Sequence, residues 1–378
     1  MPDGSLGFSP ARAGSPLPGV RKGRGALSNP ANRYERSVRD PFDDGWSTLE
    51  AALADLPPLA TTLTRDNTRR ALSWNDSPDI GFDRSINPYR GCEHGCIYCY
   101  ARPTHAWLGL SPGLDFETRL VFKPEVATIL ERELRRPGYV ARPIALGSNT
   151  DPYQPVERTL KLTRQVLEVL DRFNHPVTIV TKSAGVLRDL DILRRMASRN
   201  LVHVCLSITT LDDRLARVME PRAAAPARRL AALRVLAEAG IPAGVLAAPM
   251  IPGVNDAEME RILQAARDAG ATRAAYVLLR LPLEIAEMFE SWLHAHFPDR
   301  AARVLKLIRE TRGGGMYDSR FGTRQVGTGA YAETLAQRFT LALRRHGFEQ
   351  AGKGNQLDCA SFAVPTGSAA VPKQLALL

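Results

Sequence analysis

Residues 85–102 read SINPYRGCEHGCIYCYAR, and this stretch is the most informative part of the chain. It holds three cysteines within eight residues, in the spacing Cys-x3-Cys-x2-Cys: Cys92, Cys96 and Cys99. The chain has five cysteines, an odd number, and the other two stand alone as Cys205 and Cys359. This distribution does not indicate a disulfide framework. It predicts a metal or cluster site in a reducing compartment.

Three thiolates on one short loop can bind one iron–sulfur cubane and leave its fourth iron open. A structural zinc site usually takes four protein ligands in two separated pairs. Zinc held by the three cysteines with His94 or His105 is one alternative, and a purely structural cluster is another. An open iron can bind a small molecule, and an aromatic side chain inside the loop, such as Tyr98, would shield both from water.

Around and beyond this loop, short apolar or β-branched runs alternate with longer segments of helical period. The predicted strands span 84–89, 142–148, 176–182, 201–208, 241–250 and 273–281. The predicted helices span 124–136, 158–173, 186–199, 226–239, 256–269 and 283–294. Six βα units in a row predict an α/β fold with a parallel sheet. The repeat is shorter than the roughly 250 residues of an eight-unit barrel, so we expect a partial (βα)6 TIM-type barrel.

Composition divides the rest of the chain. Gly, Pro, Ser and Arg are frequent in residues 1–45, including the run RKGRG at 21–25, and this favours a flexible basic arm. We expect the other parts to be a lead-in segment, the barrel core, a small helical C-terminal extension and a loosely ordered tail: 46–83, 84–297, 298–350 and 351–378. Helices are expected in the extension near 299–312 and 330–346.

The charge balance is positive, with fifty Lys and Arg against forty Asp and Glu and a formal charge of +10. A positive chain attracts phosphates and suits a nucleic-acid partner. Only seven of the fifty are lysines, so a general arginine bias is the simpler explanation. No run of eighteen apolar residues is present, and no continuous hydrophobic stretch follows the N-terminal charges. We therefore expect no membrane span, no secretory signal and a cytoplasmic location.

Parallel α/β folds place their chemistry at the carboxyl ends of the strands. After the second strand, Ser148, Asn149 and Asp151 lie in a turn whose small polar side chains suit an ammonium or carboxylate ligand, although an ordinary capped turn looks similar. After the third strand, Lys182 is the only lysine between residues 162 and 305. Its compact ammonium suits a confined site, whereas a surface lysine is the alternative.

The fourth and fifth strands add further candidates. Cys205 and Ser207 are two residues apart in the fourth strand and so share one face. A single buried cysteine usually fills space, but this thiol could also donate or relay a hydrogen atom. Residues 248–256 close the fifth strand, where Gly253 permits close approach of a ligand and Asn255 can cap the next helix.

The stretch 85–102, with an aromatic residue directly before the third cysteine and its place after the first strand, resembles the radical S-adenosylmethionine (SAM) superfamily. More particularly it resembles the spore photolyase and related DNA-repair-photolyase-like group, over about residues 84–285. The resemblance implies a [4Fe-4S] cluster whose open iron is chelated by SAM. One electron then cleaves SAM to a 5′-deoxyadenosyl radical that abstracts hydrogen from a substrate.

The resemblance also implies roles for individual residues. The iron ligands would be Cys92, Cys96 and Cys99. The cofactor contacts would be, in chain order, Tyr98, Ser148, Asn149, Asp151, Lys182, Ser207, Ile251 and Gly253. Among them, Tyr98 would pack against the adenine, Lys182 would contact the methionine carboxylate, and the backbone near Gly253 would cradle the adenine. The segment 147–155 is similar to one in related proteins that contains TDPYQP.

One position departs from the family pattern. Spore photolyase has a cysteine that returns a hydrogen atom to the product, and here that position is Leu146. The product radical would then be quenched by another route, through Tyr100 or Cys205. The substrate stays open between a DNA lesion, RNA, protein and a small metabolite.

The implied partners are a one-electron reductant of the flavodoxin or ferredoxin type and, with the positive charge, a DNA or RNA substrate. The last five residues, QLALL at 374–378, resemble the short peptide that binds the bacterial sliding clamp, although chance explains so short a match. Two other classes remain. One is a nucleic-acid-binding protein with a structural or redox-sensing cluster and no turnover, and the other is a zinc-binding module.

Overall fold

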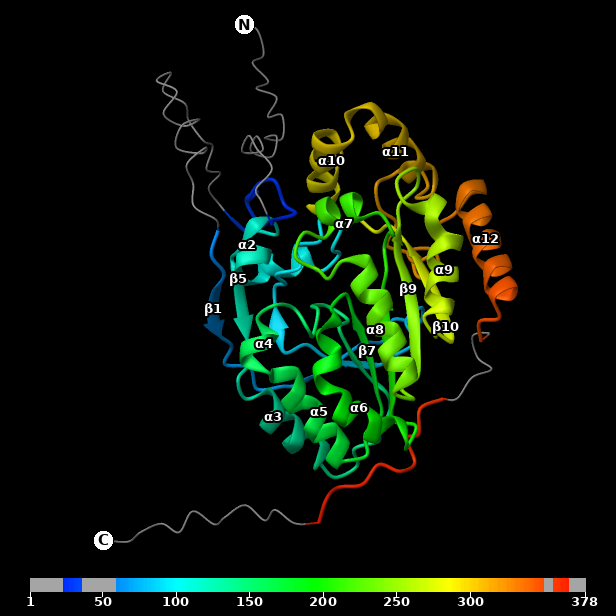
Figure 1. The fold of residues 1–378 in the computed structure, drawn as a ribbon. Helices are drawn as coiled ribbons and strands as arrows, with labels where there is room; N and C mark the ends of the chain where they lie inside the picture. Colours follow the sequence, from blue (N-terminus) through cyan, green and yellow to red (C-terminus); the bar gives the residue numbers. More distant parts are fainter. Residues whose placement is uncertain (1–22, 36–58, 350–355, 367–378) are drawn as a thin grey trace, which may run out of the picture.

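The computed structural model describes residues 23–35, 59–349 and 356–366 (Figure 1). Its main element is a seven-stranded sheet in the order β10-β9-β8-β7-β6-β3-β2. The strands are β2 (Leu72–Trp74), β3 (Arg84–Ile86), β6 (Ile144–Leu146), β7 (Val177–Thr181), β8 (Val202–Ser207), β9 (Ala243–Met250) and β10 (Arg273–Leu278). All neighbours are parallel except β2 and β3. The six predicted strands and the partial barrel are confirmed, and the described strands leave the barrel open between β10 and β2.

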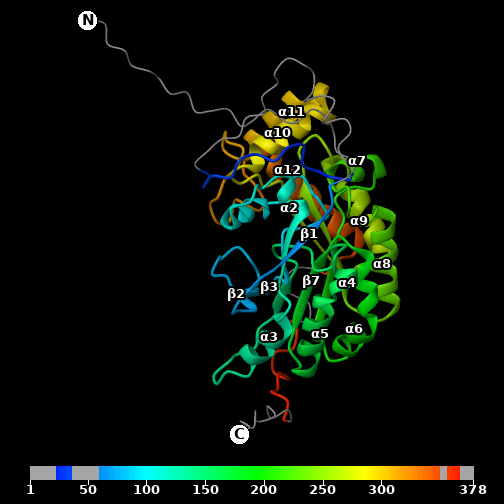
Figure 2. The ribbon, with the colours of Figure 1, turned by 90° about the vertical axis from the view of Figure 1, so that its left-hand side faces the viewer.

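Helices cover one face of this sheet, as Figure 2 shows for α5, α6, α8 and α9. The helices that follow the strands are α3 (Val126–Leu134), α5 (Leu162–Arg172), α6 (Leu190–Ala197), α8 (Pro226–Glu238), α9 (Met259–Asp268) and α10 (Ile285–His296). The helix predicted at 158–173 is interrupted, because the single turn α4 (Glu157–Leu160) is separated from α5 by Lys161 with a left-handed φ of 51°. Short 3-10 helices precede α6 and α9: η2 (Ala184–Asp189) and η3 (Asp256–Glu258).

Side-chain alternation along β8 defines the two faces of the sheet. Val202, Val204 and Leu206 are fully buried in the core that includes the helices. Cys205, which points to the opposite, concave face, is only half-buried. Successive side chains of a strand point to opposite faces, so Ser207 shares the concave face with Cys205.

A second, smaller sheet was not predicted. Its strands pair in the order β1-β5-β4: β1 (Thr62–Arg65), β5 (Arg119–Phe122) and β4 (Tyr89–Arg90). The prediction also missed α2 (Leu114–Thr118), α7 (Asp213–Met219) and the 3-10 helix η1 (Arg102–Leu108). Elements of two to seven residues are too short to produce a readable periodic pattern.

The C-terminal extension contains α11 (Pro298–Glu310) and α12 (Ala330–His346), close to the expected helices. Helix α12 packs beside α9 and against β10, where the rings of Phe339 and Tyr276 have centroids 4.7 Å apart. None of the helices in the described ranges combines the length and hydrophobicity that a membrane span needs.

The basic arm is not free over its described part, which differs from the flexible segment that its composition predicts. Arg24 and Ala26 are buried, and Arg24 donates a hydrogen bond to the Glu117 carbonyl at 2.9 Å. A Cβ on Gly25 would lie 1.8 Å from the carbonyl oxygen of Gly95, so only glycine allows this close backbone approach. The rest of the arm lies outside the described residues.

The tail shows a similar difference. Phe362 packs among Tyr139, Phe173 and His175 with ring centroids 5.4 to 6.3 Å away, and the Ala363 amide donates to the Phe173 carbonyl at 3.1 Å. The expected loose order is therefore wrong for residues 356–366, because one aromatic side chain anchors a polar segment to the core. Residues 367–378, with the QLALL sequence, lie outside the described part.

Candidate active site

The cysteine loop, residues 91–101, follows β4 at the carboxyl end of the first parallel strand. Cys92 and Cys96 are buried, and Cys99 is half-buried. Burial raises the pKa of Cys96 to about 12, so its thiolate needs the positive charge of a bound metal centre. Gly91 and Gly95 have φ values of +79° and +68°, and a Cβ on either would come within 3 Å of its neighbours. The tight coil of this loop therefore requires both glycines.

A buried ion pair holds the cysteine loop in place. The Arg102 guanidinium lies 2.5 Å from the Glu117 carboxylate, both side chains are fully buried, and Arg102 Nε donates to the Cys96 carbonyl at 2.9 Å. The same carboxylate accepts hydrogen bonds from the amides of Gly25 and Ala26 at 3.1 and 2.8 Å. The arm and the loop thus share one anchor.

The three thiols suit a cluster better than a single metal ion. Among the residues the structure describes, no group of three or more His, Cys, Asp or Glu side chains is arranged to hold one ion. His94 Nδ1 lies 3.3 Å from an Asp151 oxygen, and His105 Nε2 lies 3.0 Å from the Arg119 carbonyl. Each histidine thus has one ring nitrogen engaged within the protein, while His105 Nδ1 is buried without a hydrogen-bond partner among the described residues. A cubane takes one thiolate at each of three irons and needs no histidine, so the three cysteines suffice for it.

Tyr98 is buried within a charged network. Its hydroxyl donates to Glu220 and lies 3.3 Å from Thr209 Oγ1, and Glu220 pairs with the equally buried Arg229. Burial alone would raise the pKa of Glu220, but the charges of Arg229 and Lys182 lower it to about 2. The Lys182 ammonium lies 5.7 Å from the centroid of the Tyr98 ring. The structure therefore brings the predicted residues Tyr98 and Lys182 together.

Asn87 joins the first two strand ends. Its Oδ1 accepts from the amides of Asn149 and Thr150 at 3.1 and 3.4 Å, and its Nδ2 donates to Ser148 Oγ at 3.2 Å. The hydroxyl of Tyr100 donates to the Ser148 carbonyl. The predicted residues Tyr100, Ser148 and Asn149 thus come together from two separate loops at the carboxyl ends of the strands.

Asp151 uses its oxygens within the protein. They accept from Thr181 Oγ1 and from the Lys182 amide, both at 2.7 Å, and face His94. Burial would raise the pKa of Asp151, but His94 and these hydrogen bonds lower it to about 2. The carboxylate ties the loop after β6 to the end of β7, and its contact with the cofactor stays a prediction.

Ser207 and Ile251 approach the site from β8 and β9. Ser207 is buried and donates to the Ala248 carbonyl at 3.1 Å. Ile251 packs in the same apolar cluster as Tyr98, and its amide donates to Asn255 Oδ1 at 2.6 Å. Asn255 therefore organises the turn after β9 rather than only capping a helix.

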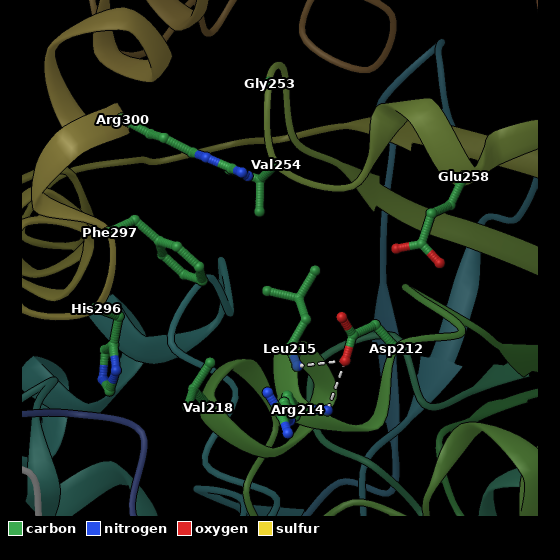
Figure 3. A pocket seen from close by; sticks show the side chains of 10 residues that line it. All are labelled: Asp212, Arg214, Leu215, Val218, Gly253, Val254, Glu258, His296, Phe297 and Arg300. Carbon is green, nitrogen blue, oxygen red and sulfur yellow. Dashed lines mark hydrogen bonds between the residues drawn. The ribbon is translucent and has the colours of Figure 1, made fainter.

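Gly253 instead faces α11, where a Cβ would lie 3.3 and 3.4 Å from Leu307 and Val304. It lines a cavity of about 390 Å³ between α7, the turn after β9 and helices α10 and α11 (Figure 3). Asp212 in this cavity is occupied in capping α7, since it accepts from the amides of Arg214 and Leu215, as Figure 3 shows. The adenine contact at Gly253 stays a prediction.

Cys205 lies on the concave face of β8, with its Sγ 3.5 Å from His203 Nδ1. Burial raises the pKa of Cys205 to about 12 and lowers that of His203 to about 4, so both groups are uncharged near neutral pH. They line a cavity of about 860 Å³ together with Cys359 and parts of β7, β9, β10 and α12. His203 Nε2 is buried without a hydrogen-bond partner in the part of the chain that is described.

A family model and two related proteins match this chain. The family model of the radical SAM superfamily matches residues 86–266, which include the cysteine loop and the strands up to β9. An uncharacterized protein of Mycobacterium tuberculosis is 36% identical over 280 residues, covering 72% of this chain and 77% of that protein. An uncharacterized protein of Methanocaldococcus jannaschii is 31% identical over 173 residues, covering 46% and 62%.

The chain belongs to the radical SAM superfamily. It is therefore an enzyme, and its cofactors are a [4Fe-4S] cluster and SAM. This radical SAM protein also shares its fold with spore photoproduct lyase complexed with dinucleoside spore photoproduct. The TM-score is 0.54 and the identity 18%, over 75% of this chain and 79% of that one.

Leu146, which the family resemblance aligns with the donor cysteine, is fully buried in the core shared by the sheet and the helices. It offers neither a reactive group nor access to a substrate. The radical SAM site also contains residues that sequence reasoning missed: Asn87, Glu117, His203, Glu220 and Arg229. Asn87 lies within the stretch 85–102 and His203 is two residues from Cys205, so both have local signals. Glu117 and Glu220 instead contact Gly25 and Tyr98, which are distant in sequence.

Proposed function

We propose that this radical SAM enzyme abstracts a hydrogen atom from a nucleic-acid substrate, in the manner of a DNA-repair lyase. The observation that carries the proposal is the buried cysteine loop at the carboxyl end of the parallel strands, where such folds bind their ligands. Cys92, Cys96 and Cys99 would hold the [4Fe-4S] cluster, which would supply the electron for reductive cleavage of SAM.

The chain's own residues bind and orient the cofactor. Burial disfavours the ammonium of Lys182, yet the charges of Cys96 and Glu220 raise its pKa, so it is a cation that can pair with the methionine carboxylate. Tyr98, fixed through its hydroxyl, offers its ring to the adenine. The other proposed contacts are Ser148, Asn149, Asp151, Ser207, and the backbone of Ile251 and Gly253.

Hydrogen return is assigned to Cys205 or Tyr100, because Leu146 cannot donate. A hydrogen-atom donor must keep its S–H bond, and burial raises the pKa of Cys205 so that it stays a thiol, with its Sγ 3.5 Å from His203 Nδ1. The S–H bond breaks, the product C–H bond forms, and the resulting sulfur radical regains one electron from the reductant and one proton. Tyr100, 45% exposed beside the cysteine loop, is the alternative donor.

A nucleic-acid substrate is supported by the net charge of +10 and by the shared fold with a lyase solved with a dinucleoside photoproduct. The proposed electron donor is a flavodoxin or ferredoxin, and the proposed location is the cytoplasm. The sliding-clamp contact through residues 374–378 stays a prediction. The competing function is a nucleic-acid-binding protein whose cluster is structural or redox-sensing.

The test is anaerobic reconstitution with iron and sulfide, reduction with dithionite, and chromatographic assay of 5′-deoxyadenosine formed from SAM. Formation that depends on all three loop cysteines is the expected result. Protein that holds four irons but forms no 5′-deoxyadenosine, alone or with DNA and RNA added, contradicts the proposal and favours the structural cluster.

With an active substrate, turnover in D2O tests the hydrogen donor. Wild-type product should carry deuterium from the exchangeable thiol, and Cys205→Ala should lose most of it. Cys359→Ala is the matched control, because that thiol lines the same cavity. Loss of the label only in Tyr100→Phe would assign the donor to the tyrosine.

A further inference from the structure

Two neighbouring arginines near the end of β10 have no anionic partner. Among the described residues, Arg280 forms neither an ion pair nor a strong hydrogen bond: its Nη2 lies 3.4 Å from the Tyr317 hydroxyl, and its Nε is buried and unpartnered. Arg312 is 3% exposed, and its Nε is also unpartnered. Nearby guanidinium groups are paired, Arg320 with Asp318 and Arg324 with Asp79.

Arg312 and Arg280 differ in the hydrogen-bond acceptors around their guanidinium groups. Arg312 donates to four backbone carbonyls, those of residues 278, 279, 323 and 324, so it fixes the end of β10 against the loop that follows α11. Burial and the charge of Arg280 lower its pKa to about 10. Arg280 has no comparable set of acceptors, so its guanidinium is the one available to a ligand.

Arg280 stands at the open side of the barrel. Its guanidinium carbon lies 5.1 Å from the centroid of the Tyr100 ring, although Tyr100 belongs to the cysteine loop and Arg280 to the far edge of the sheet. The contact therefore brings the segment after the edge strand β10 against the cysteine loop. The Tyr100 ring beneath this cation is 45% exposed, so the point is open to a ligand.

A partly buried guanidinium with an unsatisfied donor is unfavourable unless an acceptor completes it. Its planar fork matches the oxygens of a phosphate or a carboxylate, and such charge-assisted hydrogen bonds are among the stronger ones in proteins. Lys182 is already proposed to bind the cofactor carboxylate, whereas Arg280 lies on the other side of Tyr100, after the edge strand β10.

We propose that Arg280, supported by Arg312, binds an anionic group of the substrate, a phosphate or a carboxylate, beside Tyr100 at the open edge of the barrel. The inference rests on the proposed function for the identity of the bound molecule as substrate. It makes Arg280 a specificity residue that selects charged substrates and orients them toward the cofactor edge.

The test measures anion binding and cofactor binding separately, on reconstituted protein. A fluorescein-labelled ten-nucleotide oligothymidylate is titrated by anisotropy, inorganic phosphate and succinate are titrated by calorimetry, and SAM affinity is measured in parallel. The variants are Arg280→Gln and Arg280→Lys. Arg195→Gln is the control, since it removes the same charge from the outer helix α6, where Arg195 pairs with Asp171.

Arg280→Gln should weaken binding of at least one of these anions ten-fold or more. Arg280→Lys should bind with intermediate affinity, because it keeps the charge but loses the paired N–H donors of the guanidinium. Arg195→Gln and the SAM affinity of every variant should change less than two-fold. An effect on the oligonucleotide indicates a nucleic-acid phosphate, and an effect on phosphate or succinate alone indicates a small metabolite.

Unchanged binding of all three anions in Arg280→Gln, or a selective loss of SAM affinity, overturns the proposal. Formation of 5′-deoxyadenosine is recorded for each variant as well. Its absence already in the wild-type protein indicates failure of the proposed radical chemistry rather than of the anion site.

Discussion

The two ends of the barrel are built on opposite principles. At the carboxyl ends of the strands, charges are buried as pairs: Arg102–Glu117, Glu220–Arg229 and His94–Asp151. At the amino ends, aromatic rings and a neutral histidine close the core beneath the tail: Tyr139, Phe173, His175 and Phe362. Buried ion pairs are weak sources of stability, so their concentration at one end reflects the need to hold a charged cluster and cofactor in fixed positions.

The sharpest contrast is between two cysteines, one at each end. Cys96→Ala should abolish the cluster and all cleavage of SAM, because a four-iron cluster with one open iron needs a thiolate on each of its other three irons. Cys359→Ala should lose neither, since its thiol donates to the Leu357 carbonyl and lies outside the cysteine loop. Iron and sulfide content and 5′-deoxyadenosine yield measure both variants. A Cys359→Ala protein without a cluster would show that the ligand assignment is wrong.

The next test removes one member of a buried pair. Glu220→Gln leaves the Arg229 guanidinium buried without a counter-charge and should lower the free energy of unfolding by about 3–5 kcal/mol. It should also weaken SAM binding, because the hydroxyl of Tyr98 loses its charged acceptor.

The matched control is Glu168→Gln, which breaks the partly exposed pair with Arg164 and should lower the free energy of unfolding by less than about 1 kcal/mol. Denaturant unfolding measures the two variants. Equal, small effects would mean that Arg229 finds another partner and that the carboxyl end does not depend on this pair.

The sequence was informative about the strands and the cysteine loop and nearly silent about the segments that dock onto each end. The six strands and the cysteine loop were readable because apolar periodicity and cysteine spacing are local patterns. The docking of residues 23–35 and 356–366 was not, because it depends on single contacts between distant segments. Gly25 against Gly95 and Phe362 against Phe173 are packing events that leave no periodic signal.

The same limit applies within the site. Tyr98 and Lys182 could be named in advance because they belong to a motif or stand out against the composition. Glu220 could not, since it follows the unpredicted helix α7, and nothing local marks a glutamate that will be buried. Long-range charge pairing is decided by the tertiary fold, so a single sequence predicts the elements around the site better than the network that stabilises it.

Acid should destabilise the amino end through His175. Burial lowers the pKa of His175 from 6.5 to about 4, so the unfolded chain binds more protons than the folded one between these values. The stabilisation is complete above pH 6.5 and is lost as the pH falls toward 4, by on the order of 1.4 kcal/mol per pH unit. Glu220 behaves differently: its pKa is lowered from 4.5 to about 2, so its contribution is lost only below pH 4.5.

Unfolding free energies measured at intervals from pH 7 to pH 4.5 check this order. His203 adds a similar dependence, since its pKa is also about 4, and His175→Gln should therefore reduce the slope without removing it. A slope that His175→Gln leaves unchanged would place the acid sensitivity outside the amino end.

The smallest expected effect concerns the arm at the carboxyl end. Gly25→Ala puts a methyl group 1.8 Å from the Gly95 carbonyl, so the arm must move away from the cysteine loop. We expect a loss of about 1–3 kcal/mol in unfolding free energy and a several-fold faster bleaching of the cluster in air, because Glu117 loses two amide donors. Gly81→Ala, where a Cβ meets open space, is the control and should change neither quantity. Unaltered bleaching in Gly25→Ala would mean that the arm packs on the loop without protecting the cluster. Faster bleaching would mean that the arm limits access of oxygen to the cluster, a role that has no counterpart at the amino end of the barrel.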